Sequence, residues 1–412
     1  MAGSRRSRYA LAGICGAVLL IGGWNTLRYP PGNGYDAAAH IAYADDLIPG
    51  GHIPGRAPGS EYFNPPGYYA VAGSLDWVAK KLGAGEPHRA GIAVNVLFVL
   101  GTVLLTWRIA RELWPDRETL ALAAAAFVAF VPVTVKAEAM FHPETMSLFV
   151  STLALWLCVR TFADARYAGA LGVALGAAQL VRAFALWVVL AVLIALVVGR
   201  RYHAAAVAAA LAVAIPLPWY IHQTVRFGTP LAFNRGTPST SLVERRPVRF
   251  YVDPGLPDIV TRPYRPHFLN LALPTTYTEL WGDYFGNWVW NGAGTPPTSA
   301  RRRLELQSLV GILPTALAAV GWLALLLASL RSPPRLALAL VPGLGLAGYL
   351  YFTVAHPSND GDVLKATYML TTAAGWALGF AYAFDRMRGR TRQVVVALLA
   401  VCVLAELPFL VY

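Results

Sequence analysis

Long apolar segments alternate with short polar ones along most of this sequence. About eleven segments are apolar, and most approach the roughly 20 residues that a helix needs to cross a bilayer. They are residues 9–27, 89–110, 118–136, 144–162, 167–181, 183–199, 203–222, 304–330, 335–355, 364–385 and 393–412. We therefore expect an all-α integral membrane protein with about 11 transmembrane helices, forming one polytopic domain over residues 1–412.

Two of the segments, 167–181 and 183–199, are short for membrane spans, and Arg182 lies at their joint. An arginine is costly at the centre of a bilayer. We therefore expect these two segments to form a hairpin that does not fully cross the membrane.

Arginine residues fall in every second short connection between the segments. They are Arg5, Arg6 and Arg8; Arg108, Arg111 and Arg117; Arg160 and Arg166; Arg200 and Arg201; Arg331 and Arg335; and the arginines of 386–392. The alternate short connections hold only Lys136, Arg182 and Lys365. Because cationic connections stay in the cytoplasm, we expect a cytoplasmic N-terminus. The sparse connections, and two long ones at about 28–88 and 223–302, then lie outside the cell membrane.

Composition agrees with a membrane protein and argues against nucleic-acid binding. The chain is 56% hydrophobic and 14% charged, whereas soluble domains carry roughly 25% charged residues. The net charge of +12 comes from residues that flank apolar segments. No basic tract with interleaved aromatic residues stands out, so we expect membrane lipids and not nucleic acid as partners.

Both long connections carry segments that suit the membrane interface. In the first, residues 36–48 have a helical pattern, and a second amphipathic helix follows Asn64-Pro65-Pro66. Its aromatic residues favour a helix lying in the interface plane. The second connection ends near 279–290 in an aromatic segment typical of an interfacial belt. The long loops are thus expected to carry interfacial helices.

The first candidate cluster lies at the end of the first apolar segment. Asp36 and His40 are four residues apart, which places them on one face of a helix. Asp36 could simply cap that helix, but capping leaves His40 and the position at the bilayer surface unexplained. Ionisable groups at membrane depth are commonly functional.

A second cluster, Lys136, Glu138, His142 and Glu144, is expected in the short outside turn near residue 140. Pro143 and Glu144 are also ordinary helix-start residues. With Asp36 and His40, the side chains of His142 and Glu144 supply the oxygen and nitrogen ligands that a divalent cation such as Mg²⁺ or Mn²⁺ accepts. The spacing alone leaves metal binding open.

The third cluster contains His356, Asp360, Asp362, Lys365 and Tyr368, at the start of the tenth segment. Lys365 would lie near the outer interface, where a lysine often extends to solvent as an anchor. The functional alternative is capture of a phosphate by the Lys365 ammonium and the Tyr368 hydroxyl. Arg182 offers a second cation for the same anion.

The order of these motifs resembles a known superfamily. Asp36-x-x-x-His40, Asn64-Pro65-Pro66-Gly67-Tyr68-Tyr69, His142-Pro143-Glu144 and Lys365-x-x-Tyr368 follow one another within about residues 1–385. In this order the chain is similar to the GT-C polytopic glycosyltransferases, which use polyprenyl-phosphate sugars. The protein mannosyltransferase-like and aminoarabinose transferase-like branches are the most similar. Ala37 stands where many relatives have a second acid.

The resemblance implies an inverting sugar transfer at the extracytoplasmic face. It implies Asp36 as general base, with Glu144 and His142 as further catalytic candidates, and a lipid-linked donor whose phosphate meets Lys365, Tyr368 and Arg182. His40 would contact substrate. The acceptor would be a hydroxyl of a glycan, lipid or protein.

Three other functions remain open from the sequence. A transporter or flippase would need ionisable residues or broken helices near the midplane, whereas the polar clusters here fall at one face. A glycan ligase or polymerase of similar architecture would move a whole glycan. A catalytically silent partner subunit would explain Ala37.

Overall fold

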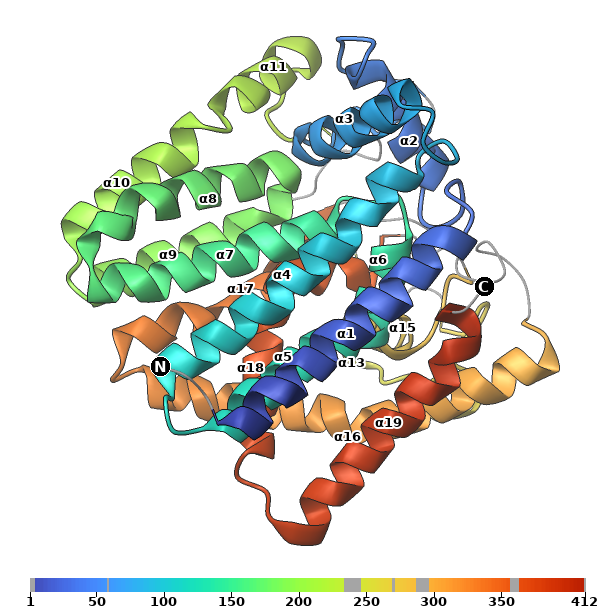
Figure 1. Cartoon of the computed structure of the whole chain (residues 1–412), viewed down its shortest axis with the longest axis vertical. Coiled ribbons are helices and arrows are strands. Elements are labelled where there is room, and N and C mark those ends of the chain that lie inside the picture. The colour runs from blue at the N-terminus through green and yellow to red at the C-terminus, as the bar shows by residue number, and fades with distance from the viewer. Residues whose placement is uncertain are drawn as a thin grey trace.

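The computed structural model describes residues 4–57, 59–232, 246–268, 271–286, 296–355 and 363–410, with side chains described up to residue 405. This part of the chain contains helices and no strand. The helices are α1 (Arg5–Arg28), α2 (Ala37–Leu47), α3 (Gly67–Lys81), α4 (Arg89–Leu113), α5 (Glu118–Phe130), α6 (Pro132–Ala139), α7 (Glu144–Ala163), η1 (Ala165–Tyr167), α8 (Ala168–Val181), η2 (Ala183–Ala185), α9 (Leu186–Val198), α10 (Tyr202–Ala214), α11 (Leu217–Phe227), α13 (Val248–Val252), α14 (Asp258–Thr261), α15 (Ala272–Trp281), α16 (Thr298–Ser329), α17 (Pro333–Ala355), η3 (Ala366–Thr372), α18 (Ala373–Phe384) and α19 (Gly389–Leu410). Figure 1 shows their arrangement.

The all-helical prediction is confirmed, whereas the count of eleven spans is not. Among the described residues, five helices are long and apolar enough to cross a membrane: α1, α4, α7, α16 and α17. Two bent pairs, α5 with α6 and α10 with α11, raise this number to seven if each pair forms one span. The other apolar segments also contain helices, which are 14 residues or shorter except for α19 with 22 residues. A multi-pass membrane protein follows from the spans that do qualify.

The break between α5 and α6 changes the position of the second cluster. Pro132 begins α6 after Val131 adopts extended backbone angles, because a proline cannot continue the preceding helix and disfavours helical angles in the residue before it. The two helices meet at a bend of 50°. Lys136 and Glu138 therefore lie on α6 and are buried. Their expected place in a short outside turn was wrong.

The joint at Arg182 agrees with the predicted interruption. Helix α8 ends at Val181, Arg182 has extended backbone angles (φ −150°, ψ 131°), and η2 leads into α9. Gly172 and Gly176 of α8 pack against α10, where a Cβ on either glycine would come within 2.7 Å of Leu211 or Ile215. Small residues let membrane helices approach closely. Helix α8 is therefore packed closely against α10, and Arg182 follows its C-terminal end.

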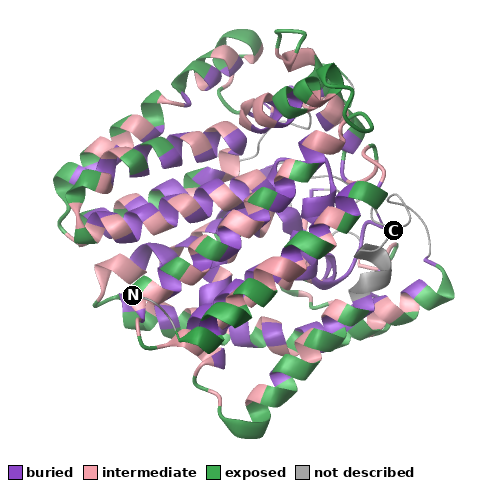
Figure 2. Ribbon diagram, in the orientation of Figure 1, coloured by how far each residue is buried: buried purple, intermediate pink, exposed green. Residues whose placement is uncertain are grey.

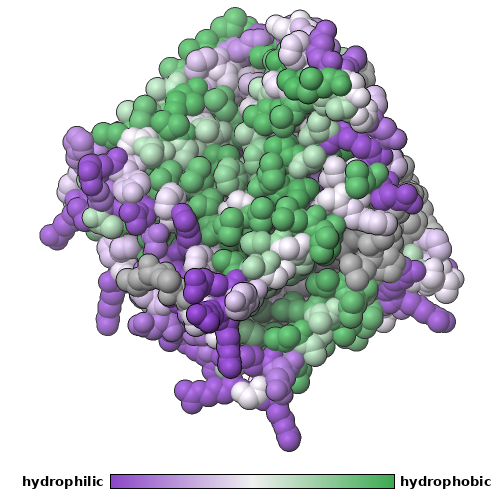
Figure 3. All heavy atoms as spheres, in the orientation of Figure 1, coloured by the Kyte–Doolittle hydropathy of each residue, from purple (hydrophilic) through white to green (hydrophobic). Residues whose placement is uncertain are grey.

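The arginine-rich connections gather at one end of the bundle. The backbone N–H of Ser4 donates to Glu118 (2.6 Å), and Arg335 donates to the Leu113 carbonyl (3.1 Å). Arg201 donates to the Phe162 carbonyl at 2.7 Å. In Figure 1 this end lies at the lower left, and α2, α3 and the end of α11 lie at the top. Figure 3 shows an apolar band between hydrophilic edges, as a membrane-embedded surface requires.

The aromatic residues of the long connections lie mostly inside the molecule. Tyr62, Tyr68 and Tyr69 are fully buried, while Trp77 on α3 stays 41% exposed. The interface-plane expectation was therefore wrong for these tyrosines. In the second connection Trp281, Tyr284 and Phe285 are also buried, which corrects their expected place in an interfacial belt; residues 287–290 lie outside the described part. Figure 2 shows buried residues concentrated where α4, α5, α6 and α7 meet.

Candidate active site

Asp36 lies directly before α2, at the end of the bundle opposite the arginine-rich connections. Its backbone is in the left-handed region (φ 51°), and its side chain makes no capping hydrogen bond to α2. Instead its Oδ2 accepts a hydrogen bond of 2.9 Å from Lys365 Nζ. The Asp36 side chain is 54% exposed and that of Lys365 is 11% exposed. The helix-capping alternative therefore does not describe this carboxylate, which remains accessible to a substrate.

Lys365 and Tyr368 flank the start of η3, and Arg182 approaches them from the α8–η2 joint. The Arg182 guanidinium carbon lies 5.6 Å from the centre of the Tyr368 ring. The Phe184 ring stacks on the Tyr368 ring, with ring centres 5.2 Å apart. The Lys365 ammonium lies 5.3 Å from the centre of the Tyr35 ring. The structure thus brings together the two cations and the hydroxyl proposed for phosphate capture.

Glu144 and Asn64 hold Arg182 in place. Arg182 Nε donates to Glu144 Oε1 at 2.8 Å, and a second guanidinium nitrogen donates to the same oxygen. The third nitrogen donates to Asn64 Oδ1. All three residues are buried. Because a buried guanidinium needs such partners, Glu144 and Asn64 keep Arg182 ordered beside Tyr368.

His40 and His142 form a neutral part of the site. The His40 Nδ1 and the Tyr69 hydroxyl share a hydrogen bond of 2.7 Å, and the two imidazole rings pack edge to face with centres 4.5 Å apart. Burial, together with the charge of Arg182, lowers the pKa of His40 to about 3. Burial also holds the pKa of His142 well below its usual range. Neither ring adds positive charge near neutral pH.

The four predicted metal ligands do not form a site that suits a divalent cation. Asp36 is paired with Lys365 and Glu144 with Arg182, so a cation of the protein already neutralises each carboxylate. His40 is engaged by Tyr69. Within the described ranges, no three histidine, cysteine or acidic side chains converge as metal ligands would. These four residues, as the structure describes them, therefore do not fit Mg²⁺ or Mn²⁺.

A third ion pair was not predicted as part of the site. Lys136, only 2% exposed, donates to Glu279 Oε1 at 2.7 Å and lies 3.6 Å from Asp283. Its ammonium is 3.5 Å from the Tyr35 hydroxyl, so Tyr35 lies between Lys136 and Lys365. A signal existed in the sequence, since Lys136, Arg182 and Lys365 are the lone cations of the segments expected to form the sparse connections. All three meet at this end of the fold.

His356, Asp360 and Asp362, the remaining members of the third cluster, lie outside the described residues. Lys365 and Tyr368, the two members to which phosphate capture was assigned, are described. The part of the predicted site whose geometry supports chemistry thus consists of Asp36, Lys365, Arg182 and Tyr368. A half-exposed carboxylate paired with Lys365 can remove a proton, while Lys365 and Arg182 bind an anion.

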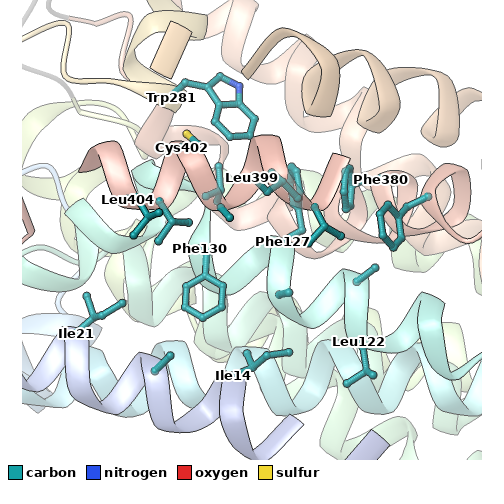
Figure 4. A pocket seen from close by; sticks show the side chains of 18 of the residues that line it. Ile14, Ile21, Leu122, Phe127, Phe130, Trp281, Phe380, Leu399, Cys402 and Leu404 are labelled. Carbon is teal, nitrogen blue, oxygen red and sulfur yellow. The ribbon is translucent and has the colours of Figure 1, made fainter. Parts of the chain in front are cut away.

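An apolar cavity of about 630 Å³ lies apart from these residues, between α1, α5, α18 and α19. In Figure 4, Phe130 extends into the space between Ile14 of α1 and Leu399 of α19. No charged side chain lines the cavity. It therefore takes no part in the proton and phosphate chemistry of the site.

Comparison with known proteins agrees with the motif order. The sequence model of a family described as dolichyl-phosphate-mannose-protein mannosyltransferase matches residues 75–222. A search of curated protein sequences finds no match. The family match covers α4 to α10 and includes His142, Glu144 and Arg182, with part of α3 and α11.

Solved structures match nearly the whole chain. ArnT from Cupriavidus metallidurans bound to undecaprenyl phosphate is 16% identical over 95% of this chain, with a TM-score of 0.55. The oligosaccharyltransferase AglB from Archaeoglobus fulgidus, in complex with an inhibitory peptide and a dolichol-phosphate, is 15% identical over 99%, with a TM-score of 0.54. The same oligosaccharyltransferase in complex with Zn and sulfate is 15% identical over 97%, with a TM-score of 0.52.

These structural similarities show that the chain shares the fold of those proteins. The chain spans 63%, 56% and 53% of the lengths of those three structures. Since ArnT and AglB are glycosyltransferases of the GT-C superfamily, the resemblance inferred from the motif order is confirmed at the level of the fold.

Proposed function

We propose that this chain is an inverting GT-C glycosyltransferase that moves a sugar from a polyprenyl-phosphate donor to an acceptor hydroxyl. The observation that carries the proposal is the convergence of Asp36, Lys365 and Arg182 from three distant segments at one end of the bundle. The undecaprenyl phosphate of ArnT and the dolichol-phosphate of AglB are ligands of the expected class. An acceptor of glycan, lipid or protein nature fits equally.

Donor binding would use the two cations. The lipid tail would lie in the bilayer, and the phosphate would contact Lys365 and Arg182, with Tyr368 as a hydroxyl donor. Charge-assisted hydrogen bonds of this kind are roughly twice as strong as neutral ones. A phosphate that draws the Lys365 ammonium toward itself would also release Asp36 from its ion pair, so donor binding would free the base.

Asp36 would then take the proton of the acceptor hydroxyl as its oxygen attacks the anomeric carbon. The new glycosidic C–O bond forms on the face opposite the phosphate, the bond from the anomeric carbon to the phosphate oxygen breaks, and the configuration inverts. The polyprenyl phosphate leaves with the bonding electron pair, and Lys365 and Arg182 stabilise its developing charge. The proton transfer, the bond formed and the bond broken balance one another without a metal ion.

The other predicted residues take no part in the proton transfer of this proposal. Glu144 would position Arg182, and His40 with His142 would form a neutral wall that contacts the sugar. Glu144 thus becomes a positioning residue in this proposal, whereas His40 and His142 would contact the substrate. The Zn of the oligosaccharyltransferase complex belongs to that protein, and the paired carboxylates here give no reason to transfer it.

A test in cells would follow the donor and the product. Deleting the gene should raise the pool of one polyprenyl-phosphate sugar and remove one sugar from a cell-envelope glycan. The wild-type chain should restore both, whereas a chain with Asp36→Asn should restore neither. Unchanged lipid-linked sugars and glycans in the deletion strain would contradict the transferase proposal. A glycan that lacks a whole repeat would instead indicate a ligase or polymerase.

We further propose that the site faces outward, with 28–88 and 223–302 as external loops of one polytopic domain. The arginine-rich connections lie together at the opposite end, and such connections stay in the cytoplasm.

In a variant whose three native cysteines are replaced by alanine, a cysteine at Ser60 should react with an impermeant thiol reagent in intact spheroplasts. A cysteine at Ser332, between α16 and α17, should react only after lysis. The reverse pattern would contradict the orientation. Ser239, in the second long loop, lies outside the described residues and offers a further labelling position.

A further inference from the structure

Glu61 belongs to the site although the sequence assigns it no role. It opens the turn before Asn64-Pro65-Pro66, and the backbone N–H of Asn64 donates to the Glu61 carbonyl at 2.9 Å. The Glu61 carboxylate accepts a second hydrogen bond, from the side-chain amide of Asn64. The turn therefore ties the Glu61 carboxylate to the residue that contacts Arg182.

Asn64 links this carboxylate to the phosphate-binding cation. Its Nδ2 donates to Glu61, while its Oδ1 accepts from Arg182. Only this orientation of the amide satisfies both neighbours, because the carboxylate accepts and the guanidinium donates. The Tyr43 hydroxyl also donates to the Asn64 carbonyl at 3.2 Å. Arg182 is thus held between Glu144 on one side and the Glu61–Asn64 pair on the other.

The turn is anchored to the rest of the fold by Tyr62. This side chain is fully buried, and its ring centre lies 4.6 Å from that of Phe227 on α11. The Tyr62 carbonyl accepts from Gln223 at 3.1 Å. Glu61 itself is half-buried. Its position is therefore set by packing, while its carboxylate remains partly open to solvent and protons.

The surroundings make the charge of Glu61 sensitive to pH near neutrality. Burial, followed by the negative charge of Asp36, raises the pKa of Glu61 to about 7, against the opposing influence of Arg182, Lys365 and Asn64. The groups that face it are Asp36 before α2, Tyr69 on α3, Arg182 after α8 and Lys365 before η3. Below the raised pKa Glu61 is neutral, and above it the carboxylate is ionised.

We propose that Glu61 is a positioning residue of the phosphate site, which orients Asn64 toward Arg182 and weakens polyprenyl-phosphate binding when its carboxylate is ionised. This inference rests on the proposed function, because it takes Lys365 and Arg182 as the phosphate ligands. An added negative charge beside those cations repels the phosphate, so the affinity should fall as the pH rises through neutrality. The neutral form keeps the hydrogen bond to Asn64 without that repulsion.

The test measures binding of undecaprenyl phosphate to the full chain in lipid nanodiscs between pH 5.5 and 8.5. Glu61→Gln keeps an acceptor oxygen for Asn64 but carries no charge. The ratio of the wild-type Kd to the Glu61→Gln Kd should be about 1 at pH 5.5 and should rise to about 3–10 at pH 8.5. Taking the ratio at each pH removes the titration of the phosphate itself. Glu61→Ala, which leaves Asn64 without this partner, should bind more weakly than Glu61→Gln at every pH.

Glu86→Gln is the matched control, since Glu86 belongs to the same long loop and is 66% exposed in an ion pair with Arg89. Its Kd ratio to the wild type should not change with pH. A flat ratio for Glu61→Gln, or equal affinities of Glu61→Gln and Glu61→Ala, would overturn the role of Glu61. In that case Lys365→Met would still weaken binding. If the wild-type chain does not bind the lipid, or Lys365→Met binds as well as the wild type, the proposed phosphate site itself fails.

Discussion

Replacing Asp36 by asparagine should lower the turnover number for sugar transfer about 100-fold or more, because a general base contributes typically about 10²–10⁴-fold. The two side chains are nearly isosteric, and Asp36 is half-exposed, so the fold should persist. The apparent KM for the lipid-linked donor should stay the same or fall, since the ion pair that competes for Lys365 is lost. The measurement is steady-state transfer by the purified chain in nanodiscs, with thermal unfolding as a check on folding.

Asp46→Asn is the matched control for this prediction. Asp46 lies at the other end of α2 and its partially exposed carboxylate is 3.7 Å from His52, so its loss should leave turnover unchanged. Near-normal turnover in Asp36→Asn would exclude Asp36 as the base, and Glu144 would be the next carboxylate to replace.

Replacing Lys365 by methionine should raise the apparent KM for the lipid-linked donor about 10- to 100-fold. A charge-assisted contact to phosphate is worth roughly 1.5–3 kcal/mol, and each 1.4 kcal/mol corresponds to about a factor of ten. The KM for the acceptor should barely change, because the acceptor approaches from the aqueous side. Part of the loss should appear in kcat if the contact tightens as the phosphate leaves.

The methionine side chain keeps most of the apolar packing of the lysine stem, and the half-exposed Asp36 can be hydrated when its partner is lost. The Lys365→Met chain should therefore fold. Lys81→Met on α3 is the control, since the Lys81 ammonium contacts only the ring of exposed Trp77 among the contacts described for it. If donor KM and kcat were both unchanged in Lys365→Met, the lysine would be an interfacial anchor and the phosphate role would pass to Arg182.

Local patterns in the sequence were sufficient for the helices and for the ends of several of them. The segment expected at 89–110 corresponds to α4, the one at 144–162 to α7, and the interruption at Arg182 separates α8 from α9. Runs of apolar residues report on these features because helix length and bilayer thickness act over about 20 consecutive residues. The same local rule could not show that Pro132 divides one expected span. Because of this break, Lys136 and Glu138 lie on α6 and are buried inside the fold.

The tertiary structure decided which ionisable residues lie next to one another in the site. Asp36 and Lys365 are 329 residues apart in the chain, and Lys136 and Glu279 are 143 apart. Their pairing depends on which helix ends meet, and hydrophobic periodicity contains no information about that. Motif order predicted Asp36, Arg182 and Lys365 at one face of the membrane. Only the structure identified the hydrogen-bond partners of these side chains. Glu61 and Asn64 became part of the site only because packing of Tyr62 against α11 holds their turn beside Arg182. The sequence by itself determined a membrane-embedded helical protein with its arginine-rich connections at one end and its acidic and histidine clusters at the other, since apolar segments and the charges that flank them are local features of the chain. The site arises from charges that long-range packing brings together.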